Sequence, residues 1–127
     1  MSSSFPVTIY HNPACSTSRN VLAMLREAGH APQVVEYLKQ PYTLEQLQAL
    51  LQAMGLRPRD VLRAKGDLYA ELGLADPSWS DDALLDTMVE HPVLVERPIV
   101  VTPLGVRLCR PKERVQEVLP DPAGAGR

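Results

Sequence analysis

Cysteine is scarce in this chain of 127 residues, which contains only Cys15 and Cys109. Two thiols cannot form a disulfide framework, and a chain of this length can bury a core without one. The cysteines do not have metal-site spacing, and the three histidines, at positions 11, 30 and 91, are scattered. We therefore expect no metal site and two thiols kept reduced.

The sequence also lacks a strong net charge and a long apolar run. Its formal net charge is −2, so no general basic field would attract nucleic acid or a membrane surface. No apolar stretch approaches the ~20 residues of a membrane span. The opening "MSSSFPVTIY" has no basic start and no signal-peptide cleavage site, so we expect a cytoplasmic protein.

Hydrophobic periodicity and turn residues predict an alternating α/β chain. We expect a strand over 6–10, a helix over 16–28, a strand over 33–37, helices over 43–54, 58–63 and 81–91, strands over 99–102 and 106–109, and a helix over 112–119. The first two strands should be parallel, and the last two an antiparallel hairpin. This order predicts a mixed four-stranded sheet flanked by helices, of the thioredoxin/glutaredoxin-like type, with a helical insert before the hairpin. We expect one domain over 1–119 and a flexible tail over 120–127.

The stretch "HNPACSTSRN", residues 11–20, carries the chemistry. Cys15 falls where a loop at the carboxyl edge of the sheet becomes a helix, so backbone N–H groups and the helix dipole should favour a thiolate there. The hydroxyls of Ser16, Thr17 and Ser18 could donate to it. Arg19, one turn later, and a protonated His11 could add positive charge. These features predict a nucleophilic Cys15 with a lowered pKa.

Simpler interpretations remain beside this one. A lone cysteine is often a buried, inert residue, Arg19 could be a solvated helix residue, and His11 could only support the loop. Spacing excludes three related motifs. Ser18 stands where a Cys-x-x-Cys pair would have its second thiol. A tyrosine-phosphatase loop requires an arginine six residues after the cysteine, whereas Arg19 lies four residues after Cys15. The loop also lacks the glycines of a P-loop. We predict that Cys109, at a strand end, is a buried structural thiol.

Two motifs together, "HNPACSTSRN" and "RPIVVTPLGVRLCRP" at 97–111, closely resemble the glutaredoxin-dependent arsenate reductase family, and the resemblance extends over about residues 5–119. It implies that Cys15 is the nucleophile and His11 the histidine of the active-site loop. The resemblance also implies a cis peptide bond before Pro98 and three arginines that hold the oxyanion: Arg63, Arg97 and Arg110. Ser16 departs from the glycine found in a family member.

The resemblance further implies the reaction and its partners. Cys15 would attack arsenate, and the electrons would come from glutathione, as co-substrate, and from glutaredoxin, with no bound cofactor. We expect a monomer. Two alternatives stay open: a thiol-dependent reductase of another substrate, and a transcription regulator of the same fold that binds RNA polymerase. The second would typically use the Cys-x-x-Cys switch that this chain lacks.

Overall fold

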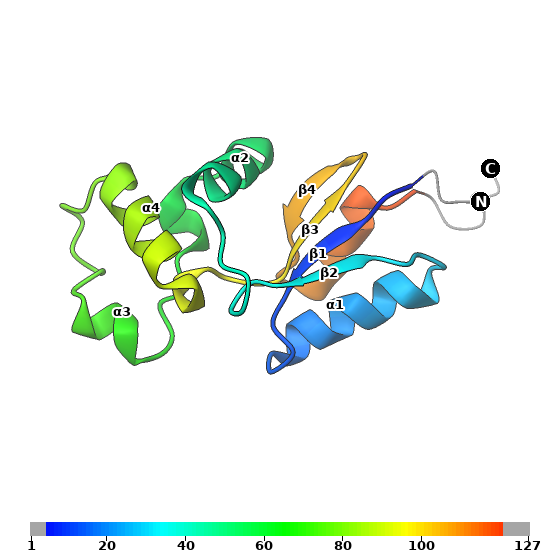
Figure 1. The fold of residues 1–127 in the computed structure, drawn as a ribbon, viewed down its shortest axis with the longest axis horizontal. Helices are drawn as coiled ribbons and strands as arrows, with labels where there is room; N and C mark the ends of the chain where they lie inside the picture. Colours follow the sequence, from blue (N-terminus) through cyan, green and yellow to red (C-terminus); the bar gives the residue numbers. More distant parts are fainter. Residues whose placement is uncertain (1–4, 121–127) are drawn as a thin grey trace. The chain divides into compact units, whose positions relative to one another are not determined.

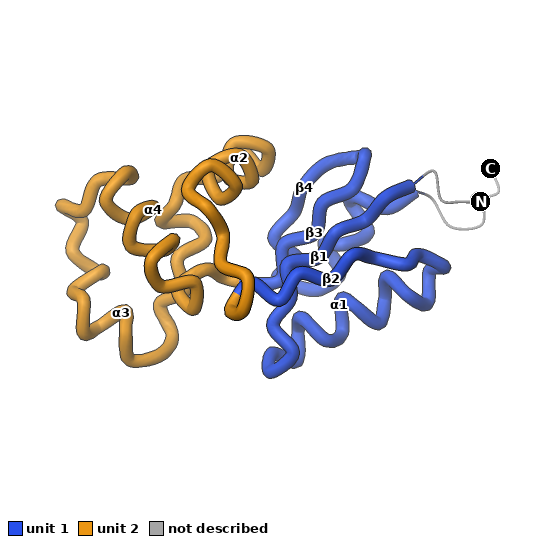
Figure 2. The backbone as a smooth tube through the Cα atoms, in the orientation of Figure 1, with its two compact units in different colours: residues 1–37, 97–127 blue, residues 38–96 orange. Residues whose placement is uncertain are grey.

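The computed structural model describes residues 5–120, so all of the predicted tail except Pro120 lies outside the described residues. The chain divides into two compact units (Figure 2), one made of residues 1–37 and 97–127 and the other of residues 38–96. The first unit contains the sheet, and the second is helical. That residues 1–119 act as one domain stays a prediction.

The first unit contains a four-stranded sheet in the order β2-β1-β3-β4 (Figure 1). Its strands are β1 (Thr8–His11), β2 (Gln33–Glu36), β3 (Ile99–Thr102) and β4 (Gly105–Leu108). β1 runs parallel to β2 and antiparallel to β3, and β3 and β4 form an antiparallel hairpin. The predicted mixed sheet of thioredoxin-like type is therefore confirmed.

The bounds of the first strand differ from the prediction of 6–10. β1 begins at Thr8 and continues to His11. Pro6 cannot donate a ladder hydrogen bond, and the β1–β2 register extends from the Thr8–Gln33 pair to the His11–Glu36 pair. The strand thus carries His11 itself, directly before the loop that holds Cys15.

Two helices pack on the sheet of the first unit: α1 (Ser16–Glu27) and the 3₁₀ helix η3 (Lys112–Val118). Val21 and Leu25 of α1 are fully buried against Ile9 and Val100 of the sheet. The segment predicted as a last helix over 112–119 thus adopts a tighter 3₁₀ winding. Thr102 joins β3 to η3 by donating a 2.6 Å hydrogen bond to the carbonyl of Val118. The buried Val21 and Leu25 thus hold α1 against the sheet.

The second unit is the predicted helical insert between β2 and β3. It contains α2 (Leu44–Met54), η1 (Pro58–Val61), α3 (Asp67–Glu71), α4 (Asp81–Glu90) and η2 (Pro92–Leu94). Ser80 caps α4, since its hydroxyl accepts a hydrogen bond from the Ala83 N–H. No helix within residues 5–120 is long and apolar enough to cross a membrane.

Helix α2 begins and ends where local residue chemistry predicts. The Thr43 hydroxyl accepts from the Gln46 N–H, and the Gln46 side chain accepts from the Thr43 N–H, both at 3.0 Å. Gly55 ends the helix in the left-handed conformation, with φ of 69°. The capping box and the glycine thus define both ends.

Replacing Thr43 by alanine should lower the free energy of unfolding by about 1 kcal/mol, because it removes an N-cap acceptor. Urea denaturation measures this change. Thr43→Ser keeps the hydroxyl and is the matched control, expected to retain most of the stability. Equal stability of the alanine and serine variants would contradict a contribution from the cap.

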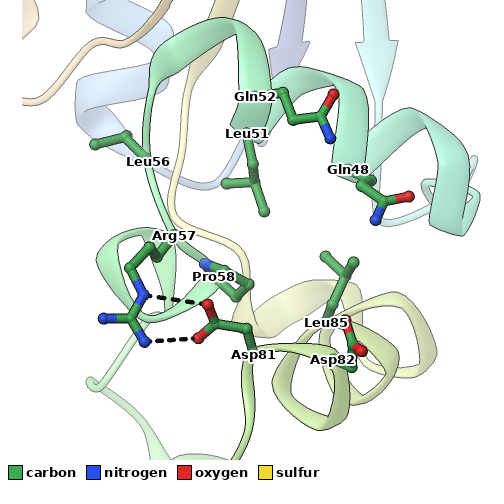
Figure 3. Close-up of a pocket in the computed structure, with 9 residues that line it drawn as sticks. All are labelled: Gln48, Leu51, Gln52, Leu56, Arg57, Pro58, Asp81, Asp82 and Leu85. Carbon is green, nitrogen blue, oxygen red and sulfur yellow. Dashed lines mark hydrogen bonds and ion pairs between the residues drawn. The ribbon is translucent and has the colours of Figure 1, made fainter.

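The second unit also contains a pocket of about 190 Å³ (Figure 3). Arg57 donates two hydrogen bonds, of 3.1 and 3.0 Å, to the carboxylate of Asp81 at its wall. The lining residues are Gln48, Leu51, Gln52, Leu56, Arg57, Pro58, Asp81, Asp82 and Leu85. None of them is a cysteine or a predicted site residue. Both cysteines, Cys15 and Cys109, belong to the first unit.

Candidate active site

The strand register of the first unit gathers three separate chain segments at one end of the sheet. Tyr10 near the end of β1 pairs with Ile99 at the start of β3, and Ile99 also pairs with Leu108 at the end of β4. The residues that follow β1, precede β3 and follow β4 must therefore meet. They are the Cys15 loop, Arg97 and Arg110, which are separated by up to 95 positions in sequence.

Cys15 occupies the N-cap position of α1. Its backbone is extended, with φ of −98° and ψ of 123°, and its side chain is half-buried. The first turn of α1 contains no acidic residue. The amino end of the helix is therefore open to an anion at Cys15 Sγ.

Arg97 is a buried cation with unused donors. The residue is only 8% exposed, and within residues 5–120 its Nε and Nη1 groups have no hydrogen-bond partner. A buried guanidinium with unsatisfied N–H donors is costly unless an anion compensates it. Arg97 precedes Pro98 through a cis peptide bond, as predicted, directly before β3. Its unused N–H groups fit an anionic ligand.

Arg110 joins the other two segments. Its Nη1 lies 3.9 Å from Cys15 Sγ and donates a 3.1 Å hydrogen bond to the carbonyl of Arg97. A second cis peptide bond, not predicted from the sequence, links Arg110 to Pro111. Arg110 thus places a guanidinium beside the thiol, and its role as an oxyanion ligand stays a prediction.

The pKa of Cys15 is lowered by its surroundings. Burial acts against this, since desolvation disfavours a thiolate and is the largest single effect. It is outweighed by the hydrogen bond and charge of Arg97 together with the backbone N–H groups of Ser18 and Thr17. The lowered pKa predicted for Cys15 is therefore present in the structure, with Arg97 as its main source.

His11 and Ser18 have another arrangement than the sequence suggested. The Ser18 hydroxyl is fully buried and lies 2.6 Å from His11 Nδ1, and it also accepts a 3.0 Å hydrogen bond from the Asn12 N–H. Burial lowers the pKa of His11, and Arg26 and Arg19 lower it further, although Glu36 opposes them. His11 is therefore a neutral support of the loop near pH 7, rather than the source of positive charge that we had considered.

The remaining predicted loop residues, Arg19, Thr17 and Ser16, have three different positions relative to the thiol. The Arg19 side chain donates a 2.9 Å hydrogen bond to the carbonyl of Pro13. This bond links the first turns of α1 to the Cys15 loop. Thr17 acts on Cys15 through its N–H group. The side chain of Ser16 is exposed at the first residue of α1.

Arg63 belongs to the second unit. The Arg63 N–H donates a 2.7 Å hydrogen bond to the carbonyl of Leu94, and Leu62 pairs with Val95. This pairing brings Arg63 Nη1 to 3.3 Å from a carboxylate oxygen of Glu96. The assignment of Arg63 as an oxyanion ligand stays a prediction.

Cys109 is fully buried in the core of the first unit. Desolvation raises its pKa to about 12, so it is a protonated thiol. The expectation of a structural cysteine agrees with this position. Among residues 5–120, no three histidine, cysteine or acidic side chains gather as metal ligands would.

Sequence reasoning missed one buried residue of the loop, Asn12. It is 7% exposed, and its side-chain oxygen accepts a 2.9 Å hydrogen bond from the Ala14 N–H. The signal was available in the Asn12–Pro13 pair, because an asparagine before proline favours the start of a turn.

Comparison with known proteins places this chain in a family. The ArsC family model matches residues 10–118. An arsenate reductase of Rhizobium meliloti is 62% identical over 115 residues, which make up 91% of this chain and 82% of the relative. The arsenate reductase of Escherichia coli K12 is 54% identical over the same shares. A solved arsenate reductase from Vibrio cholerae superposes with a TM-score of 0.88 at 49% identity, covering 92% of this chain and 100% of the other. The chain therefore belongs to the ArsC family.

Proposed function

We propose that this protein is an arsenate reductase that uses Cys15 as its nucleophile. The observation that carries the proposal is the pairing of a low-pKa thiol with Arg97, a buried arginine whose Nε and Nη1 groups have no partner among the described residues. Such a site needs an oxyanion to satisfy its donors and presents a thiolate to attack it. The curated relatives named above are arsenate reductases, which supports arsenate as the oxyanion.

In the first step, the Cys15 thiolate attacks the arsenic of a bound arsenate. A sulfur–arsenic bond forms, an arsenic–oxygen bond breaks, and the departing hydroxide leaves as water after taking a proton. Arg97, Arg110 and the N–H groups at the start of α1 hold the oxygens and stabilise their charge. We propose Arg63 as the third arginine that binds the oxyanion.

Reduction then requires two electrons, which two thiols supply when they become a disulfide. Cys15 is one of these thiols. Cys109 is a poor second one, because it is buried and protonated. We propose glutathione as the second thiol and glutaredoxin as the protein that resolves the mixed disulfide. Overall, arsenate and two thiols give arsenite, one disulfide and water.

The same proposal includes a reducing compartment, the cytoplasm, because the mechanism needs Cys15 as a thiol. It also includes a monomer, since the gathered site residues Cys15, Arg97 and Arg110 all come from one unit of one chain. No bound cofactor is required, because the electrons arrive with the thiol substrates.

The purified protein should form arsenite from arsenate only when glutathione and glutaredoxin are both present. NADPH oxidation coupled through glutathione reductase gives the rate, and chromatography of the arsenic species identifies the product. Omission of glutaredoxin should reduce the rate to background. Thioredoxin with thioredoxin reductase is the matched alternative donor.

Two results would count against different parts of the proposal. Full activity with thioredoxin and without glutathione would replace the proposed donor but keep the substrate. Absence of arsenite with every donor, despite rapid reaction of the Cys15 thiol with alkylating agents, would favour another substrate.

A further inference from the structure

Asn12 makes a hydrogen bond with each of its backbone groups and with its side-chain oxygen, all within the Cys15 loop. Its N–H donates to the Ser18 hydroxyl at 3.0 Å, its carbonyl accepts from the Cys15 N–H at 3.0 Å, and its side-chain oxygen accepts from the Ala14 N–H at 2.9 Å. Asn12 therefore contacts the two residues that follow Pro13 and also the first turn of α1.

We propose that Asn12 is a positioning residue that sets Cys15 at the start of α1. The catalytic part of this inference rests on the proposed function, but the placement of the thiol does not. Cys15 is held from both directions, since its N–H donates to the Asn12 carbonyl and its own carbonyl accepts from the Arg19 N–H at 3.0 Å. The first bond depends on the turn that the Asn12 side chain closes.

The side-chain chemistry of asparagine suits this position. An asparagine oxygen can accept from the N–H two residues later and so reproduce a backbone turn, which alanine cannot do. The carboxamide is also neutral. An aspartate could close the same turn, but it would place a second negative charge three residues from the thiolate. Asn12 thus orients Cys15 without opposing its ionisation.

The orientation matters because the thiolate is stabilised by directional groups. The N–H groups of Ser18 and Thr17 and the side chain of Arg97 each act on Cys15 Sγ. A displacement of about 1 Å at a catalytic group can cost about 100-fold in rate. Loosening the turn should therefore affect both the pKa of Cys15 and the attack on the substrate.

Asn12→Ala should raise the pH midpoint of Cys15 alkylation toward the ~8.5 of an ordinary thiol. It should also lower kcat/KM for arsenate by about 10- to 100-fold. Iodoacetamide rates across a pH series measure the midpoint without requiring arsenate turnover. The matched control is Asn20→Ala on the exposed side of α1, expected to behave like the wild type. The charged groups at the thiol, Arg97 and Arg110, are unchanged in both variants.

Asn12→Asp covers the case in which the alanine variant does not fold. It keeps the acceptor for the Ala14 N–H, so the limiting alkylation rate at high pH should equal that of the wild type while the midpoint rises. A purely structural role would lower the melting temperature of Asn12→Ala and leave both midpoint and kcat/KM at control values. That result, or a limiting rate in Asn12→Asp below that of the wild type, would overturn the inference. If neither the wild type nor any variant reduces arsenate, the alkylation profiles still test the positioning role of Asn12.

Discussion

Replacing Cys15 by serine should reduce arsenate turnover by about three orders of magnitude or more, the scale of loss expected when an enzyme loses its nucleophile. A serine hydroxyl stays protonated near neutral pH and is a weak nucleophile, and it cannot form the disulfide that completes the electron transfer. The coupled assay measures the loss. Binding of arsenate should persist, because Arg97 and Arg110 remain, and calorimetric titration checks this.

Cys109→Ala is the matched control for the loss of a thiol. Cys109 is fully buried and its pKa is raised to about 12, so its removal should leave kcat unchanged. The smaller side chain leaves a cavity and should lower the melting temperature modestly. Turnover that survives in Cys15→Ser but is lost in Cys109→Ala would reverse the two assignments.

Replacing Arg97 by methionine should lower kcat/KM for arsenate by about 100- to 1,000-fold, the scale of losing a preorganised donor to a developing oxyanion. It should also raise the pKa of Cys15, since the Arg97 side chain is the largest stabiliser of the thiolate. A raised pKa means less thiolate near neutral pH, so alkylation should slow there and recover as the pH increases. The pH series of alkylation rates measures this shift.

The same variant should not be less stable than the wild type in anion-free buffer. Two side-chain nitrogens of the buried Arg97 have no partner among the described residues, so methionine removes a desolvated charge and fills similar space. Arg114→Met is the control, because Arg114 is exposed and pairs with Glu117. Near-wild-type kinetics in Arg97→Met, or an equal loss in Arg114→Met, would contradict the role given to Arg97.

Much of the fold could be predicted from the sequence because its signals are local. The Thr43–Gln46 capping box and Gly55 defined α2 to within a residue of the structure, since these interactions lie within one helical turn. The parallel order of the first two strands follows from the helix between them. The strand bounds were less predictable, because the end of β1 at His11 depends on pairing with Glu36 of β2.

Some features of the candidate site could likewise be predicted from local sequence, and others could not. The position of Cys15 at the start of α1 and the lowered pKa were predictable, because the helix amino end is encoded in adjacent residues. Arg97 and Arg110 came from a family resemblance, and without it they would have passed as surface charges. The burial of Arg97 and its unpartnered donors depend on the tertiary packing around the start of β3, which local sequence does not encode.

The sequence by itself determined that the candidate nucleophile Cys15 begins a helix and that Ser18 takes the place of the second thiol of a Cys-x-x-Cys pair, because both residues lie within one turn of a helix whose start is locally encoded. Only the tertiary structure decided which groups surround the thiol. The pairing of Tyr10 with Ile99 and of Ile99 with Leu108 brings residues up to 95 positions apart to one end of the sheet. It also decided that the buried His11 is neutral and contacts Ser18, because desolvation is a property of the folded surroundings and not of the residue.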